Sequence, residues 1–545
     1  MSCQVIDADV IVIGMGCAGL RAAIAARRQG RDVLLISKNS GSSAEISAFN
    51  VVLKDADSRD SLEAHYRDTI KGGGYISNPT LVGILVNEAE SAFRELDEMG
   101  IPFEKSDGRI RQRRVSGSSF ARTVYCGDIL GRQLVSRLRE LATSMGVKIW
   151  TQCFVTRLVR YGTRVTGALG LDLKKQDLVC FNSNSIVLAT GGLGQIYAFT
   201  TNSPDITGDG YAMAYRAGAK LIDMEFVQFE PTVAVYPEEC RGTVIPTALF
   251  GYGAKLRNVK EERFIEQFDA KNMELCSKDL LARAITLEIS KGLATSHGGV
   301  YLDLSDSKRE TIMNGFPTLY ERIRIVDPWT IPIEVAPAAH YHMGGVLIDE
   351  QCRSSLSGLF AAGEVAGGIH GANRIAGNSC TDILVFGARA GRFAAQTTQR
   401  PKCKIQKIEI EAERNRISRF FRKGKDPSKL MKQLQKVMWK NVGMIRNYVG
   451  LKIALDTMGD LRREARNATA SNFDELKNVF ELFNAMTSSE LVVRAALMRN
   501  ESRGAHFRRD YPKTDGERWL KNIVIQERKG RIFAKTLVLK NRTTR

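Results

Sequence analysis

Residues 10–19 read Val-Ile-Val-Ile-Gly-Met-Gly-Cys-Ala-Gly. The four apolar residues predict a buried strand, and we expect a helix of small residues over residues 20–29 and a second strand over residues 33–37. Gly14 permits a tight turn, Gly16 leaves room for a phosphate, and Gly19 lets the helix pack closely on the strand. Because the loop also opens a helix N-terminus, where free N–H groups attract anions, this β-α-β unit predicts a site for a dinucleotide pyrophosphate.

The end of the second strand narrows the choice of dinucleotide. Units of this kind that bind NAD usually place an Asp or Glu there, which holds the ribose hydroxyls. Here the strand ends in Ser37-Lys38. This departure argues against a generic NAD site.

The chain has 545 residues, of which 43% are hydrophobic and 26% charged, as is typical of soluble globular proteins. No stretch approaches the roughly 18 consecutive apolar residues that a membrane helix needs. The first apolar run already belongs to the β-α-β unit, so we expect no signal peptide. We therefore expect a cytoplasmic protein, with peripheral attachment to the inner face of the cytoplasmic membrane through partners as the alternative.

The ten cysteines are scattered and form no C-x-x-C pair, so the sequence predicts reduced thiols and no metal or iron–sulfur site of its own. The net charge is +19, and basic residues are densest over residues 414–446 and from residue 518 onward. A solvated basic helix face and a contact with an acidic protein partner both fit this excess. Nucleic acid is the third interpretation, but no nucleic-acid motif accompanies the charge, so we expect none to bind.

A series of further motifs follows the glycine loop. They are Ile36-Ser37-Lys38, Ala189-Thr190-Gly191-Gly192, Thr207-Gly208-Asp209-Gly210, Phe226-Val227-Gln228-Phe229-Glu230-Pro231-Thr232, His340-Tyr341-His342-Met343-Gly344-Gly345, Ala362-Gly363-Glu364, His370-Gly371-Ala372-Asn373-Arg374, Glu501-Ser502-Arg503-Gly504-Ala505-His506 and Asp510-Tyr511-Pro512. In this order they resemble the fumarate reductase, succinate dehydrogenase and L-aspartate oxidase flavoprotein family over nearly the whole chain.

That resemblance implies FAD as the cofactor. It places Glu364 at the ribose or ribityl region, Ser379 near the isoalloxazine and Asp209 close to the cofactor, although Asp209 could also form a turn and Ser379 could cap a helix. The predicted cofactor-binding residues are Gly14, Gly16, Cys17, Ala18, Gly19, Ser37, Lys38, Ser43, Ala44, Glu45, Ala189, Thr190, Gly191, Asp209, Glu364, Asn378 and Ser379.

Two glycine-rich blocks, separated by a stretch of mixed helix and loop character, predict one nucleotide-binding domain interrupted by a cap. The predicted fold class is α/β, with a Rossmann-like FAD-binding domain, a smaller α+β capping domain, a C-terminal helical domain and a short β tail. The predicted bounds are residues 1–233 and 336–400 for the two parts of the FAD-binding domain, 234–335 for the cap, 408–515 for the helical domain and 516–545 for the tail.

The segment after Lys38 departs from the family. Members that attach FAD covalently do so through a histidine soon after the Ser-Lys pair, but no histidine occurs between Lys38 and His65, and Glu45 falls at or near that position. A carboxylate cannot make the histidyl link, so we expect noncovalent FAD. The next residues, Ser47-Ala48-Phe49-Asn50, are similar to the Ser-Ala-Ile-Asn of adenylylsulfate reductase flavoproteins.

This sequence keeps the residues with which the family binds one end of a dicarboxylate substrate. The resemblance assigns substrate binding there to His340 and Arg374. A planar guanidinium suits this task because two of its N–H groups can bond the two oxygens of one carboxylate. Arg374 could instead form a buried structural ion pair, and His342 could contact the substrate or serve packing alone.

The residues with which the family binds the other end of the dicarboxylate are replaced. The family's Gln-Phe-His-Pro-Thr has become a motif with Glu230 at the histidine position, and the family's Thr-Glu-x-x-Arg proton pathway aligns with Pro246-Thr247-Ala248-Leu249-Phe250. The family's catalytic arginine aligns with Lys278. A lysine can act as a general acid when burial lowers its pKa, or it can simply pair with Glu230.

Because the flavin motifs are intact and the substrate motifs are changed, we expect the flavin electron chemistry to be kept and the substrate to differ. Our leading hypothesis is hydride transfer between FAD N5 and a small carboxylate-bearing substrate, with Arg374 and His340 on the carboxylate, Lys278 moving the proton and Glu230 reading a neutral or cationic distal group. Electrons would be exchanged with an iron–sulfur subunit. The alternatives are an oxidase like L-aspartate oxidase, an adenylylsulfate reductase-like flavoprotein, and a non-catalytic flavin relay in a larger redox complex.

Overall fold

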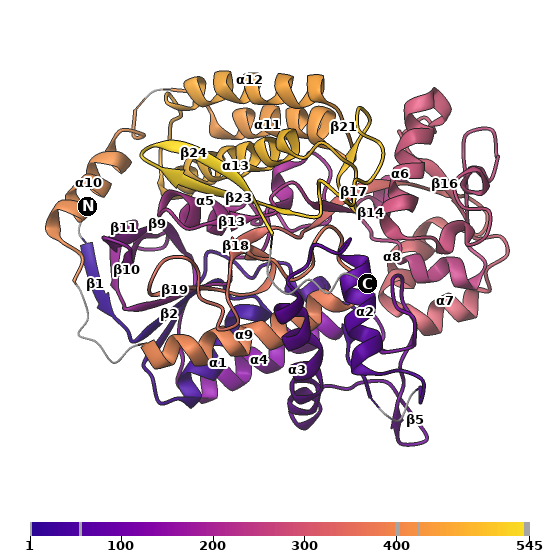
Figure 1. The fold of residues 1–545 in the computed structure, drawn as a ribbon, viewed down its shortest axis with the longest axis horizontal. Helices are drawn as coiled ribbons and strands as arrows, with labels where there is room; N and C mark the ends of the chain where they lie inside the picture. Colours follow the sequence, from indigo (N-terminus) through magenta and orange to yellow (C-terminus); the bar gives the residue numbers. More distant parts are fainter. Residues whose placement is uncertain (1–2, 54–56, 398–403, 423, 539–545) are drawn as a thin grey trace.

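A five-stranded parallel sheet forms the centre of the protein (Figure 1). The computed structural model describes residues 3–53, 57–397, 404–422 and 424–538. The sheet has the order β19-β12-β2-β3-β8, and its strands are β2 (Val10–Ile13), β3 (Val33–Ile36), β8 (Lys148–Trp150), β12 (Ser185–Leu188) and β19 (Leu359–Ala361). Strands from before the predicted cap and β19 from after it therefore share one sheet, which confirms the predicted Rossmann-like α/β class.

Helices α1 (Cys17–Arg28) and α9 (Asn378–Gln396) pack against this sheet. Helix α4 (Leu130–Ser144) packs on α1, α3 (Pro79–Glu98) packs on α9, and α2 (Leu62–Gly72) packs on α3. Helix α1 begins three residues earlier than predicted, because Gly19 allows its first turn to lie directly on the preceding loop. A Cβ built on Gly19 would lie 1.9 Å from the carbonyl oxygen of Gly14.

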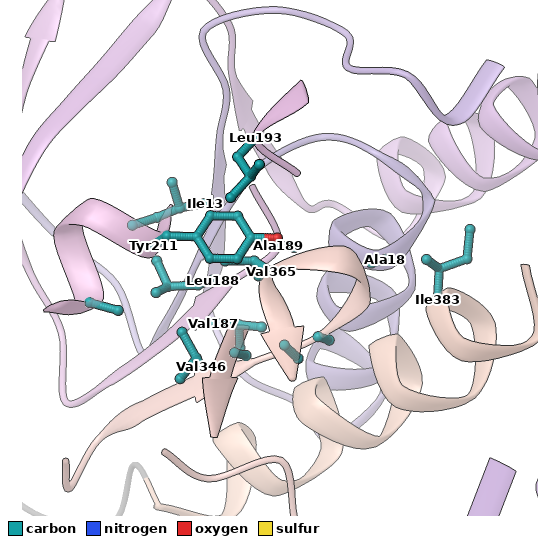
Figure 2. Close-up of a cluster of buried hydrophobic side chains, with 14 of the residues drawn as sticks. Ile13, Ala18, Val187, Leu188, Ala189, Leu193, Tyr211, Val346, Val365 and Ile383 are labelled. Atoms are coloured by element: carbon teal, nitrogen blue, oxygen red, sulfur yellow. The ribbon is translucent and has the colours of Figure 1, made fainter. Parts of the chain in front are cut away.

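A cluster of buried side chains lies between this sheet and helix α5 (Asp209–Arg216). Figure 2 shows the ring of Tyr211 among Ile13, Leu188 and Leu193, and all four side chains are almost completely buried. The Tyr211 hydroxyl donates to the carbonyl oxygen of Glu364 at 2.7 Å. This packing holds the loops after β2, β12 and β19 together.

Two further sheets flank the centre. The first has the order β1-β11-β10-β9 and consists of β1 (Cys3–Asp7), β9 (Cys153–Tyr161), β10 (Arg164–Asp172) and β11 (Asp177–Asn182). The second has the order β20-β18-β13-β23-β24 and consists of β13 (Leu221–Ile222), β18 (Gly345–Leu347), β20 (Ala366–Gly367), β23 (Asn522–Arg528) and β24 (Arg531–Leu537). Strand β23, in the predicted tail, pairs with β13 of the predicted FAD-binding domain.

Residues 234–335, the predicted cap, contain a hydrophobic cluster of their own. Their sheet has the order β14-β17-β16-β15, with β14 (Val227–Tyr236), β15 (Lys255–Arg257), β16 (Val300–Asp303) and β17 (Ile333–His342), and its helices are α6 (Lys278–Glu288), α7 (Arg309–Gly315) and α8 (Pro317–Ile323). Both predicted boundaries fall inside the paired strands β14 and β17. The same two strands therefore carry residues of the cap and residues of the site.

Helices α11 (Pro427–Val442), α12 (Tyr448–Ala465) and α13 (Phe473–Met498) pack above the centre in Figure 1. Helix α10 (Lys407–Ser418) lies at the left, beside the sheet that contains β9, where Glu413 accepts a hydrogen bond from Thr156 at 2.6 Å. Short strand pairs complete the fold: β4 (Phe49–Asn50) with β7 (Thr123–Val124), β5 (Lys105–Ser106) with β6 (Arg109–Ile110), and β21 (Ile445–Arg446) with β22 (Phe507–Arg508). Within the described ranges, no helix combines the length and apolar character that crossing a membrane requires.

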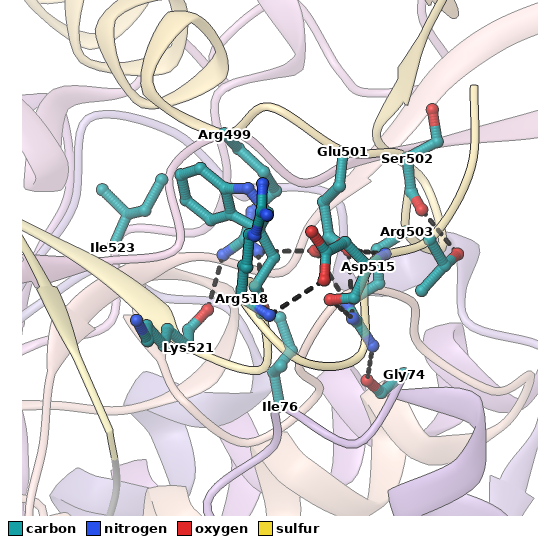
Figure 3. Close-up of polar contacts among 12 residues, drawn as sticks. Gly74, Ile76, Arg499, Glu501, Ser502, Arg503, Asp515, Arg518, Lys521 and Ile523 are labelled. Atoms are coloured by element: carbon teal, nitrogen blue, oxygen red, sulfur yellow. Dashed lines mark hydrogen bonds and ion pairs between the residues drawn. The ribbon is translucent and has the colours of Figure 1, made fainter. Parts of the chain in front are cut away.

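A buried network of charges ties these parts together (Figure 3). The Arg499 guanidinium pairs with Glu225 at 2.6 Å and with Glu501 at 2.9 Å, and all three side chains are fully buried. Arg503 pairs with the same Glu501 at 2.8 Å and donates to the carbonyl oxygen of Gly74 at 2.7 Å. The end of α13 is thereby fixed to the segment just before β14 and to the loop after α2.

Replacing Arg499 tests how much stability this network provides. In Arg499→Met, Glu225 loses its buried partner, and we expect unfolding to become easier by about 3–5 kcal/mol. Arg494→Met is the matched control, because Arg494 lies in α13 shortly before Arg499, is 40% exposed and pairs with Glu490, a contact expected to contribute about 0–1 kcal/mol. Thermal unfolding of both variants measures the difference, and equal midpoints would show that the network is not stabilising.

Candidate functional site

A single cavity of about 1110 Å³ joins the glycine loop to the predicted substrate residues. Its walls include the loops that follow β2, β12 and β19, all at the carboxyl ends of parallel strands. Ligands of open α/β sheets bind at this edge. The predicted cofactor residues that line the cavity are Gly14, Gly16, Ala18, Ser37, Lys38, Ser43, Ala44, Glu45, Ala189, Thr190, Gly191, Asp209, Glu364 and Ser379.

The glycine loop leaves no room for side chains. Gly14 has a φ of +114°, and a Cβ built there would lie 2.1 Å from the carbonyl oxygen of Ala189. A Cβ at Gly16 would lie 2.8 Å from the Oγ of Ser43, which accepts a hydrogen bond from the N–H of Cys17 at 3.0 Å. The loop therefore exposes backbone to the cavity, as a pyrophosphate requires.

Two further groups fit a dinucleotide. The hydroxyl of Thr190 is buried without a hydrogen-bond partner at the cavity wall. Glu364 accepts the N–H of His342 at 2.9 Å, and burial raises the pKa of its carboxyl to about 7. These polar groups suit the hydroxyl and phosphate groups of FAD, so the residues present fit this cofactor.

Lys38 is held by acidic side chains. Its ammonium donates to Asp209 at 2.7 Å and to Glu481 at 2.5 Å, and also bonds Thr207 at 2.9 Å. Asn484 donates to Asp209 at 2.7 Å. Helix α13 thus supplies two residues that hold the cavity-lining side chains of Lys38 and Asp209. The motifs gave no sign of either residue, since both stand in a mainly apolar helix far along the chain.

Three predicted cofactor residues do not line the cavity. Cys17 and Gly19 lie in the first turn of α1, and Asn378 is fully buried beneath the loop. The Asn378 amide bonds Asn50 at 2.8 Å and Thr69 at 3.0 Å. Asn378 therefore positions the surrounding loops.

His342, predicted among the catalytic residues, also lies outside the cavity. Its ring nitrogens face the carbonyl oxygens of Gly344 at 2.9 Å and Met224 at 3.0 Å. Burial lowers the pKa of the imidazole to about 4, so the ring is neutral and donates one hydrogen bond. Of the two predicted roles, its contacts support packing behind Glu364.

Arg374 occupies the opposite end of the cavity. Its guanidinium donates to Gln228 at 2.8 Å and lies 4.5 Å from the centre of the Tyr341 ring. Its Nε is buried and has no hydrogen-bond partner. No carboxylate of the described chain comes within ion-pair distance of this guanidinium, so the alternative of a buried structural ion pair is not what the geometry shows.

Glu230, Lys278 and His340 lie together at the same end. The Lys278 ammonium bonds both carboxylate oxygens of Glu230, at 2.7 and 2.8 Å, and the His340 Nε2 is 3.7 Å from the carboxylate. Burial raises the pKa of Glu230, but the charges of Lys278 and Arg374 outweigh it and bring the pKa below its ordinary value. Burial lowers the pKa of His340 to about 4, so this ring is neutral at pH 7.

The predicted motifs also miss Arg113. It lines the cavity together with Arg374 and Lys278. The local signal was three arginines within residues 111–114, shortly before the Ser/Gly-rich residues 116–119. Among the described residues no cluster of three or more His, Cys, Asp or Glu is placed to hold a metal ion.

The sequence of this chain matches two known protein families and several known proteins. Residues 9–380 match the FAD binding domain family, and residues 431–542 match the fumarate reductase flavoprotein C-terminal family. The chain is 39% identical to a fumarate reductase (CoM/CoB) subunit of Methanothermobacter marburgensis, over 97% of this chain and 98% of that protein. It is 33% identical to an L-aspartate oxidase of Yersinia pestis, over 92% of this chain and 96% of that protein.

A solved structure shows the same fold. An E. coli quinol fumarate reductase chain superposes with a TM-score of 0.93 at 29% sequence identity, covering 99% of this chain and 98% of that chain. Matching families together span most of the sequence, and relatives above 30% identity cover nearly all of it. The protein therefore belongs to the fumarate reductase and succinate dehydrogenase flavoprotein family and is an FAD-dependent oxidoreductase.

Proposed function

We propose that this flavoprotein catalyses hydride transfer between FAD N5 and a carbon–carbon bond next to a carboxylate, in a small substrate other than fumarate or succinate. Bound FAD supplies the two-electron chemistry. The observation that carries the proposal is that the buried guanidinium of Arg374, in the same cavity as the glycine loop, has no carboxylate partner among the described residues and an Nε without a hydrogen bond. A substrate carboxylate would provide the anion that this cation lacks.

The residues around Arg374 would orient that carboxylate. Gln228 and the Tyr341 ring fix the guanidinium, and Thr201 bonds the Nδ1 of His340 at 2.8 Å. A neutral His340 can donate one N–H to the substrate, and its orientation is set before the substrate binds. We assign substrate binding to Arg374 and His340.

The Glu230–Lys278 pair would set the specificity at the other side. A substrate carboxylate about 4 Å from an unpaired Glu230 would meet a repulsion on the order of 4 kcal/mol at an effective dielectric near 20. Lys278 offsets this charge, so the pair is close to neutral and no longer offers the cationic contact that a second carboxylate needs. Two N–H groups of the ammonium point to Glu230, and a lysine has a third, which we assign to proton transfer.

The Glu230–Lys278 contact also argues against the alternative of an oxidase like L-aspartate oxidase. Glu230 already holds an ammonium, that of Lys278, and so offers no free carboxylate to the amino group of an aspartate.

For electron supply we propose an iron–sulfur partner protein. The support is that the relative from Methanothermobacter marburgensis is named as one subunit of its enzyme, which implies that further chains complete that enzyme.

Arg374 is the first residue to test. We expect reduced holoprotein to reduce crotonate, which has one carboxylate, faster than fumarate. Arg374→Gln should weaken crotonate binding about 10-fold to 100-fold, because hydrogen bonds to a charged group contribute about 1.5–3 kcal/mol. Titration calorimetry measures the affinity, with Arg137→Gln on the exposed face of α4 as control. Fumarate turning over as well as crotonate would reject the altered substrate.

The Glu230–Lys278 pair is tested by removing one or both charges. Lys278→Met leaves Glu230 buried and unpaired, and we expect a loss of about 3–5 kcal/mol in stability. The double variant Glu230→Gln, Lys278→Met should recover most of that loss. If Lys278 also moves a proton, both variants lose turnover although only the first is unstable. A stable, inactive single variant would contradict the structural part of this assignment.

We also propose that FAD is held without a covalent bond. Residues 43–45 line the cavity and offer Ser, Ala and Glu in place of the linking histidine. After acid precipitation of the purified holoprotein, we expect all of the flavin absorbance in the supernatant. Yellow, fluorescent protein in the pellet would show a covalent link.

A further inference from the structure

We propose that the cavity contains a second anion-binding site at Arg113, and that the substrate carries a second anionic group there. This inference rests on the proposed function, since it adds a second contact to the substrate whose carboxylate binds Arg374. The chemistry recognised is a terminal carboxylate, sulfonate or phosphate joined to the reacting end by an apolar spacer.

The side chain of Arg113 is held in a fixed position. Its backbone bonds that of Thr123 in both directions, at 2.9 and 3.1 Å. Its guanidinium lies 4.4 Å from the centre of the Tyr125 ring and 5.8 Å from that of Phe316. Both ring contacts favour a cation at this point.

Arg113 has no counterion. Its Nε is buried without a hydrogen-bond partner, and among the residues that the structure describes no carboxylate forms an ion pair with it. The neighbouring acid is Asp128, whose oxygens instead accept the backbone N–H groups of Thr318 at 3.3 Å and Leu319 at 3.0 Å. Burial lowers the pKa of Arg113, which reflects how poorly its charge is compensated.

Arg122 shows how the same region treats a structural arginine. It is fully buried, and it pairs with Asp60 at 2.7 Å and with Asp68 at 2.7 Å. A buried guanidinium without such partners is costly, because its desolvation is not offset. The contrast within one short segment indicates that the anion for Arg113 comes from outside the chain.

Arg113 stands at the substrate end of the cavity. Three residues further on, the carbonyl oxygen of Ser116 accepts the N–H of Ala376, and a Cβ on Gly117 would lie 2.7 Å from the side chain of Ile375. The segment that begins with Arg113 therefore packs against the loop that carries Arg374. Both arginines line the same cavity.

The two arginines nevertheless form separate subsites. Arg374 contacts Gln228 and the ring of Tyr341, whereas Arg113 contacts the rings of Tyr125 and Phe316. Phe316 and Tyr252, whose ring centres are 6.2 Å apart, both line the cavity on the side of residues 234–335. These aromatic walls suit an apolar spacer between two anionic ends.

Binding of paired ligands to the holoprotein tests this site. The probes are trans-enoates of increasing length that end either in a methyl group or in a carboxylate, sulfonate or phosphonate. At one chain length we expect an anionic end to tighten binding about 10-fold to 100-fold over the methyl end, as measured by titration calorimetry. The three end groups rank the chemical sources of the anion.

Variants of Arg113 test whether this residue causes the tighter binding of enoates with an anionic end. Arg113→Gln should abolish the advantage of the anionic end and leave the methyl-ended enoates within about twofold of the unchanged protein, which also shows that the variant is folded. Arg113→Lys keeps the charge and should retain part of the advantage. Arg111→Gln is the matched control, because Arg111 is exposed two residues away and should change nothing.

The outcomes separate the two proposals. If methyl-ended enoates bind but an anionic end brings no gain, or the gain survives in Arg113→Gln, the second site is wrong and the proposed function stands. If no enoate binds at any length, the proposed function fails and the second site fails with it.

Discussion

The backbone of Gly14 lies directly against that of Ala189, and the rest of the site depends on this contact. The two residues follow the neighbouring parallel strands β2 and β12, so their loops meet at the carboxyl edge of the sheet. A Cβ at Gly14 would come within 2.1 Å of the Ala189 carbonyl oxygen, and any side chain there would push the loops apart. Because Gly19 repeats this closeness one turn later, helix α1 begins at the loop itself and its N–H groups face the cavity.

The lysines and arginines discussed along the cavity form two groups, those paired with acidic side chains and those without such partners. Lys38 is satisfied by Asp209 and Glu481, and Lys278 by Glu230, so these cations are compensated within the chain. Arg374 and Arg113 are buried in part or in full but have no acidic partner among the described residues. A buried cation is stable only when an anion or a ring of acceptors balances it. We therefore propose that the uncompensated arginines bind ligands, whereas the pairing of the lysines holds the cavity walls in place.

The C-terminal region contributes to the cofactor end as well as to stability. Helix α13 contacts Lys38 and Asp209 through Glu481 and Asn484, and the residues just after it join the Arg499 network. Strand β23 then extends the sheet that contains β13 and β18. Segments far apart in sequence thus meet around one cavity, and both the C-terminal helices and the strands after them contact the FAD-binding part.

The sequence by itself determined the β-α-β unit, the α/β class and the flavoprotein family, because turn glycines and short motifs act through local backbone geometry that their spacing reveals. It also identified Arg374, His340, Glu230 and Lys278, since each stands in a motif. Only the tertiary structure decided what these side chains face. The His342 ring turns away from the cavity, Lys278 bonds Glu230 across 48 residues, and Arg113 meets Phe316 from a distant part of the chain. Burial, ion pairing and pKa depend on partners that the chain brings together by folding, and no spacing along the sequence specifies those partners.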